Sequence, residues 1–135
     1  MTTHGITANP AFRTATVALG AAGLALLLPV TPAIAGDDRV ERTGSCSNGA
    51  RWDLKVKTDD GRLEVEGEVD SNRNGQSWAW NFRHNGSISA RGNSTTRGPS
   101  GSFSVERRMV NLQGTDKIVF VARHNGQTCR GVVNF

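Results

Sequence analysis

The sequence predicts an all-β protein: an antiparallel β-sandwich of immunoglobulin-like architecture, with about seven or eight strands. Two observations lead to this prediction. Beyond residue 36, apolar and charged residues alternate with the period of a strand, and no helical period is present. Sharp-turn dipeptides separate the alternating segments, with Asn-Gly occurring four times and Asp-Gly once.

Residues 1–35 have the pattern of a cleavable export signal. Arg13 precedes an uncharged run from Ala15 to Leu28, which is too short to span a bilayer as a helix. Ala33-Ile34-Ala35 then supplies the small-x-small sequence that signal peptidases recognise. We expect cleavage after Ala35, so that residues 36–135 form a single secreted, extracellular domain without a stable membrane anchor.

The exported part contains both cysteines, Cys46 and Cys129. An even cysteine count in an oxidising compartment predicts one disulfide bond between them. Removing the signal leaves 15 basic and 12 acidic residues, a net charge of +3. This mild excess is compatible with an anionic partner such as a cell-wall polymer.

Two segments, 51–57 and 63–69, each alternate apolar with charged residues over seven positions. A two-residue loop at Asp60-Gly61 would join them as a hairpin, with Val56 opposite Val65 on the buried face. On the other face, this register predicts three pairs of opposite charge: Lys57 with Glu64, Lys55 with Glu66, and Arg51 with Asp70.

The segment 78–83 places Trp78, Trp80 and Phe82 on one face of a further strand. If that face were exposed, Trp78 and Trp80 could form a flat platform for sugar rings. The alternative is an ordinary core, which a sandwich of this size needs. With a three-residue loop at 84–86, the following strand would place Ile88 opposite Phe82 and Ala90 opposite Trp80.

Several segments together resemble a group of small uncharacterised secreted proteins of actinobacteria. They are Asp59-Asp60-Gly61-Arg62, the run from Glu66 to Trp78, Pro99 to Arg108, and Cys129-Arg130-Gly131. The resemblance covers essentially the whole mature chain. It implies a secreted single domain, and it brings no activity, cofactor or catalytic residue.

Asp70-Ser71-Asn72-Arg73-Asn74-Gly75 matches the first six positions of a calcium-binding loop. Asp70, Asn72 and Asn74 are therefore candidate calcium ligands. The match then fails, because Asn81 stands where the loop would need a bidentate glutamate. The alternative is an Asn-rich β-turn whose side chains cap their own backbone, and we expect no metal site and no cofactor.

No catalytic constellation is recognisable, because no motif brings a nucleophile, a base and an orienting group together. The arginines of the second half come from several strands and need not share one side, and no nucleic-acid recognition motif is present. We therefore expect a non-enzymatic binding or structural domain for an extracellular macromolecule or cell-wall polymer, and no nucleic-acid partner. Two alternatives stay open: a carbohydrate or wall-polymer binding module, and a hydrolase inhibitor or small hydrolase that uses the loop 93–101 with Arg97.

Overall fold

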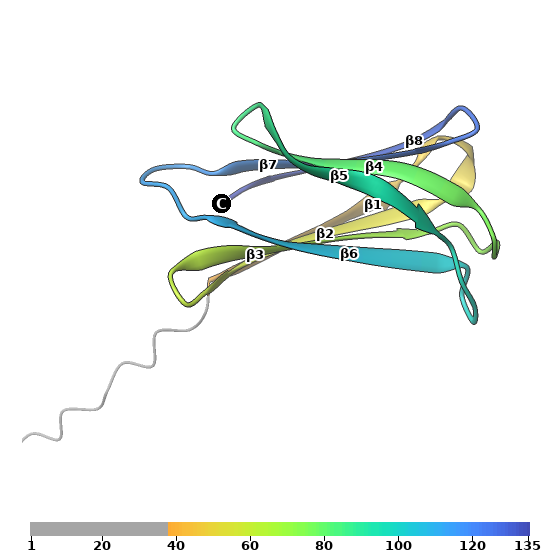
Figure 1. The fold of residues 1–135 in the computed structure, drawn as a ribbon, viewed down its shortest axis with the longest axis horizontal. Helices are drawn as coiled ribbons and strands as arrows, with labels where there is room; N and C mark the ends of the chain where they lie inside the picture. The colour runs from red at the N-terminus through yellow and green to blue at the C-terminus, as the bar shows by residue number, and fades with distance from the viewer. Residues whose placement is uncertain (1–37) are drawn as a thin grey trace, which may run out of the picture. The chain divides into compact units, whose positions relative to one another are not determined.

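The computed structural model describes residues 38–135 (Figure 1), and the predicted export signal at 1–35 lies outside this part. The described chain forms eight strands and one short 3-10 helix, η1. In chain order these elements are β1 Arg39–Ser45, η1 Ser47–Gly49, β2 Arg51–Asp59, β3 Arg62–Asp70, β4 Ser77–His84, β5 Ser87–Thr95, β6 Ser102–Val110, β7 Lys117–His124 and β8 Gln127–Asn134. Within residues 38–135, no helix has the length and hydrophobicity needed to cross a membrane.

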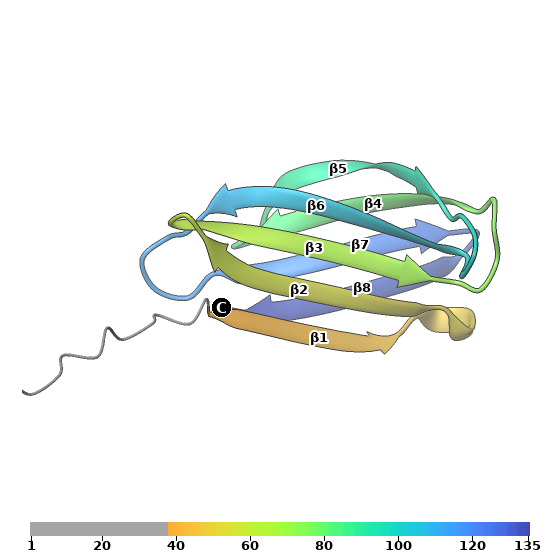
Figure 2. The same ribbon diagram turned by 90° about the horizontal axis from the view of Figure 1, so that it is seen from below.

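The strands form two antiparallel sheets that face each other as two layers (Figures 1 and 2). Sheet A has the order β1-β2-β3-β6, and sheet B has the order β5-β4-β7-β8. The predicted antiparallel β-sandwich is thus confirmed. In the immunoglobulin topology the second strand pairs with the fifth, whereas β2 here lies between β1 and β3, so the likeness is one of architecture.

The hairpin of β2 and β3 has the register that its charge pattern predicts. Val56 pairs with Val65, and the three pairs of opposite charge face each other at the predicted positions. The turn residues Asp60 and Gly61 both have positive φ, which a two-residue turn of this hairpin type requires. A shift of the register by one residue would turn all the apolar side chains of a strand from the core to solvent. The alternation of apolar and charged residues therefore fixes the pairing.

The predicted register of the β4–β5 hairpin is wrong. The loop has two residues, Asn85 and Gly86, and both have positive φ. A β-bulge between Phe82 and Arg83 then shifts the pairing, so that Phe82 lies opposite Ala90 and Trp80 opposite Gly92. The shift has a packing cause, because a side chain at Gly92 would occupy the space of the Trp80 ring.

The core lies between the two sheets and is built from inward residues of the central strands and of the edge strands β6 and β8. Its largest fully buried side chains include Trp78, Phe82, Phe120, Leu54 and Leu63. At the edge strand β6, the guanidinium of Arg107 lies 5.0 Å from the centre of the Trp80 ring. This contact covers the aromatic core where the sandwich would otherwise be open to water.

The predicted disulfide bond is present between Cys46 and Cys129. Cys46 follows the edge strand β1 of sheet A, and Cys129 lies in the edge strand β8 of sheet B. The bond therefore ties the two sheets together along one side of the sandwich. Both cysteines belong to the buried core.

Candidate functional site

The two sheets differ sharply in charge. Strands β4, β5, β7 and β8 of sheet B contain no aspartate or glutamate. Strands β1, β2, β3 and β6 of sheet A contain eight acids: Glu41, Asp53, Asp59, Glu64, Glu66, Glu68, Asp70 and Glu106. The uneven distribution makes the outer face of sheet B the strongest candidate for a binding surface.

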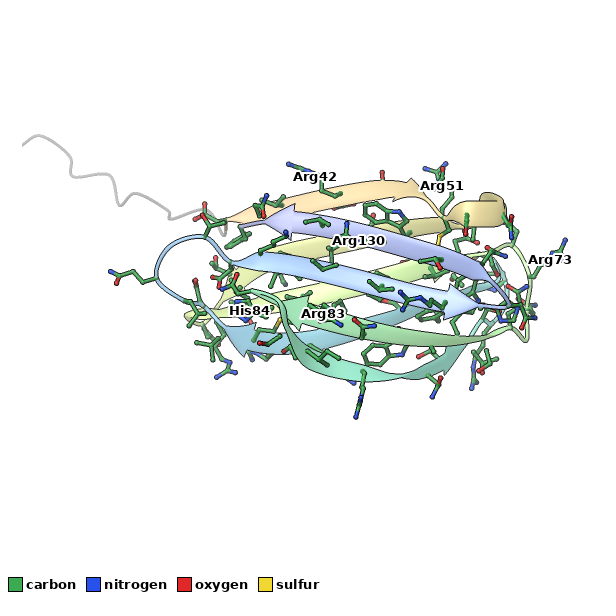
Figure 3. All side chains as sticks on the ribbon, turned by 90° about the horizontal axis from the view of Figure 1, so that it is seen from above. Arg42, Arg51, Arg73, Arg83, His84 and Arg130 are labelled. Atoms are coloured by element: carbon green, nitrogen blue, oxygen red, sulfur yellow. A yellow bond between two sulfur atoms is a disulfide. The ribbon has the colours of Figure 1, made fainter. Side chains whose placement is uncertain are left out.

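Five cationic residues of sheet B point away from the core. Their orientation follows from strand alternation, because their sequence neighbours, such as Phe82 and Ala122, are buried between the sheets. The five are Arg83 on β4, Arg91 on β5, Lys117 and Arg123 on β7, and Arg130 on β8. Figure 3 looks onto this sheet, with Arg83 and Arg130 labelled. We call this surface the cationic face.

The register keeps the five cations apart from one another. Each lies opposite uncharged residues on the neighbouring strands: Arg123 opposite Ala79 and Thr128, Arg130 opposite Val121, Arg91 opposite Asn81, Arg83 opposite Val119 and Ile88, and Lys117 opposite Asn134. Directly opposed like charges would destabilise the sheet, and this staggered arrangement avoids them. The cations still share one face, so their fields add for an approaching anion.

None of these five cations takes part in an ion pair within the described residues. Sheet A is different, since Lys55 and Lys57 lie within 3.0 Å of the carboxylates of Glu66 and Glu64. The charge of sheet A is thus largely compensated inside the molecule. The charge of the cationic face is free to meet an external anion.

Two shallow hollows lie side by side on the cationic face. The larger, of about 660 Å³, is lined by Arg83, Lys117, Arg123 and Arg130 around an apolar floor of Val119 and Val121. The second, of about 510 Å³, is lined by Arg91, Asn81 and again Arg123. Because Arg123 lines both, the hollows form one continuous surface across the four strands.

Asn81 lines the second of these hollows. Its Oδ1 atom is buried and has no hydrogen-bond partner within the described residues. An acceptor of this kind is normally satisfied by a protein donor, by water or by a ligand. This acceptor is covered by the described residues, so it lies beneath the cations and is not exposed on the cationic face.

Of the two interpretations of Trp78 and Trp80, the structure supports the ordinary core, because both tryptophans are buried. Trp78 has no exposed surface and Trp80 is 5% exposed. Their rings point into the core, where Trp78 packs near Phe103 and Trp80 against Phe82. The burial of these large apolar rings stabilises the sandwich and removes them as a stacking surface for sugars.

Of the candidate calcium residues, Asp70 ends β3, and Asn72 and Asn74 lie in the turn between β3 and β4. The Asp70 carboxylate accepts the backbone N–H of Asn72 at 3.0 Å, as in an Asx turn. Asn72 has a positive φ, which asparagine tolerates in such turns. The side chain of Asp70 thus caps its own backbone. No group of three or more His, Cys, Asp or Glu residues within 38–135 is placed to hold a metal ion.

The loop that carries Arg97 is shorter than predicted, because β5 extends to Thr95. The backbone N–H of Arg97 donates to the carbonyl of Ser102, and its own carbonyl accepts from Gly101 and Ser102. A substrate-like inhibitor needs a free extended backbone to pair with a protease. The backbone of Arg97 is already bonded within the loop, so this geometry disfavours the inhibitor hypothesis.

One buried ionisable pair was not foreseen from the sequence. Asp116, in the segment between β6 and β7, is 1% exposed and hydrogen-bonds to Nε2 of His84 on β4. Its second oxygen accepts the backbone N–H of Leu112. The hydrogen bond between Asp116 and His84 holds the segment 111–116 against sheet B. His124 has a different role, with Nδ1 bonded to the carbonyl of Ser77.

Comparisons of the chain with protein-family models, with curated proteins and with solved structures found no match. The resemblance to small secreted proteins of actinobacteria therefore remains a prediction.

Proposed function

We propose that this protein is a secreted, non-enzymatic binding domain that holds an anionic extracellular polymer, such as a wall polysaccharide, on its cationic face. One observation carries the proposal: five cations from four strands, none of them in an ion pair within residues 38–135, share a surface whose strands contain no carboxylate. An array of this kind attracts anions over the whole face.

The shape of the face favours a polymer over a small anion. The cations are spread over four strands and do not converge on one deep pocket. A single exposed charge contact contributes little binding free energy, on the order of 1 kcal/mol or less. A chain with repeated anionic groups can engage several of these cations at once, and the small contributions then accumulate.

An extracellular location is supported by two features of the chain. The sequence of residues 1–35 has the order of an export signal, with a small-x-small cleavage pattern at 33–35. Cys46 and Cys129 form a disulfide bond, and such bonds persist in oxidising compartments.

Dextran sulfate and neutral dextran of the same length provide a matched pair of probes. We expect the purified protein to be retained on immobilised dextran sulfate and not on dextran. Retention should fall steeply as salt is raised, because screening weakens exposed charge contacts. The double variant Arg123→Gln/Arg130→Gln should lower the affinity for dextran sulfate by roughly tenfold or more.

The control makes the same change of charge on the other sheet. Arg51→Gln/Arg62→Gln removes two outward cations of sheet A and should leave the affinity within about twofold. Equal loss in both double variants would mean that only net charge matters, and absence of retention by the native protein would refute the proposal. Tighter, salt-dependent binding to DNA than to dextran sulfate would instead favour nucleic acid as the partner.

A further inference from the structure

A third hollow lies at the end of the sandwich where the disulfide is, away from the centre of the cationic face. It has a volume of about 410 Å³ and is formed by η1, by the turn between β3 and β4, and by the start of β8. Its lining is rich in carboxamides. The polar side chains are those of Asn48, Ser71, Asn72, Arg73, Gln76 and Gln127.

Two of these carboxamides have unused acceptors. The Oε1 atoms of Gln76 and Gln127 are both buried, and neither has a hydrogen-bond partner within the described residues. A buried acceptor without a donor destabilises the folded protein. The side chains of both glutamines line the hollow, so a molecule that enters it and turns these amides toward itself would supply the missing donors.

The lining restricts the chemistry of that molecule. Among the described residues, no carboxylate lines the hollow whereas Arg73 does, so the electrostatics disfavour a metal ion or an ammonium group. A carboxamide both donates and accepts hydrogen bonds, and a hydroxyl group does the same. Adjacent hydroxyls can therefore bond to the oxygen and the nitrogen of one amide. We propose that this hollow binds a neutral hydroxyl-bearing unit, a sugar or a polyol.

The proposal is independent of the polymer site proposed for sheet B, because it rests on different residues. The test uses ¹⁵N-labelled protein titrated with glucose, N-acetylglucosamine and glycerol. We expect at least one probe to produce saturable shifts in the side-chain amide signals of Gln76 and Gln127, and intermolecular NOEs from probe protons to these side chains.

Gln76→Met and Gln127→Met keep the length of the side chain and remove the acceptor. Each should weaken the affinity for the bound probe by roughly three- to tenfold. Neither should lower the melting temperature by more than a few degrees, because no protein hydrogen bond to these oxygens is lost. Asn93→Ala, on the outer face of sheet B, is the control and should bind the probe as the native protein does.

The proposal is overturned if none of the three probes gives saturable shifts, if the NOEs place the probe elsewhere, or if both methionine variants bind as tightly as the native protein. If a methionine variant fails to fold, the glutamine oxygen has a structural role. The NOEs of the native protein then decide the question on their own.

Discussion

The ring of Phe120 on β7 lies directly against Gly67 on β3, in the opposite sheet. A methyl group added at Gly67 would meet Cδ2 and Cε2 of that ring at 2.8 Å. Gly67→Ala should therefore destabilise the protein by about 1–3 kcal/mol through overpacking, measured as the free energy of unfolding in urea.

A double variant tests the cause. Phe120→Leu replaces the ring with a smaller side chain and so frees space next to Gly67. In that background, Gly67→Ala should cost at least about 1 kcal/mol less than in the native protein. Additive costs would show that the methyl group acts through the backbone of β3 and not through the ring.

The two core tryptophans should differ in their response to replacement by phenylalanine. Nε1 of Trp80 donates to the hydroxyl of Ser94 at 3.0 Å, whereas Nε1 of Trp78 is buried without a partner in the described residues. Trp80→Phe should therefore cost about 1 kcal/mol more than Trp78→Phe, because it alone breaks a hydrogen bond. Thermal or urea unfolding of both variants measures the difference, and a larger loss for Trp78→Phe would contradict the assignment.

The buried Asp116 depends on His84 for one of its two side-chain hydrogen bonds. His84→Ala should destabilise the fold by roughly 2–4 kcal/mol, since it leaves one oxygen of a buried carboxylate unpaired. Asp116→Asn in the same background should recover part of the loss, because a neutral amide is less costly to bury. If the second change lowers the stability further, the carboxylate has another partner that matters more than His84.

Loss of the disulfide should be the most costly single change in the molecule. The bond closes a loop with a sequence separation of 83 residues. The loop-entropy model gives about 4–5 kcal/mol for a loop of this length. Cys46→Ala/Cys129→Ala should unfold at much lower urea concentration than the native protein, and a loss below about 1 kcal/mol would contradict the model.

The local sequence pattern was sufficient to predict the register of the β2–β3 hairpin, because one of its faces is uniformly apolar and the other carries complementary charges. It failed for the β4–β5 hairpin. There, Asn85-Gly86 fits either a two-residue turn or part of a longer loop. The choice depends on Trp80, whose ring needs the space above Gly92, and this is a tertiary contact that strand alternation does not encode.

The cationic face was missed for a related reason. Its arginines lie on four strands, and only the pairing of β4 with β7 brings Arg83 and Arg123 to the same sheet face. Arg107, by contrast, lies over Trp80 at the sandwich edge. The signal that could have pointed to the face is the absence of any acid between Asp70 and Glu106 and again after Asp116. Combined with the odd-even positions of the strands, it predicts a sheet surface without carboxylates.

Sheet A carries a pH-dependent element at Asp53. Burial first, and the neighbouring Glu41 second, raise the pKa of Asp53 to about 6. A hydrogen bond from Arg39, and then one from Asp53, lower the pKa of Glu41. Below about pH 6 the pair therefore holds its proton on Asp53 and its negative charge on Glu41.

Between about pH 4 and pH 6, folded Asp53 keeps a proton that the unfolded chain has released. The stabilisation that Asp53 contributes to the folded state is therefore fully present below about pH 4 and is lost as the pH rises to about 6. The lowered pKa of Glu41 has the opposite effect. It stabilises the folded protein at pH values above the ordinary pKa of a glutamate, and this stabilisation is lost as the pH falls.

Asp53→Asn should isolate the contribution of Asp53. The amide can still donate to Glu41, and it cannot acquire the charge that burial penalises. We expect the variant to be more stable than the native protein above pH 6, and the difference to shrink toward zero as the pH falls to about 4. The free energy of unfolding of both proteins, measured across this range, gives the result. Asp60→Asn makes the same change of charge at the tip of the β2–β3 hairpin, and if it reproduced the profile, the effect would come from net charge and not from the Asp53–Glu41 pair.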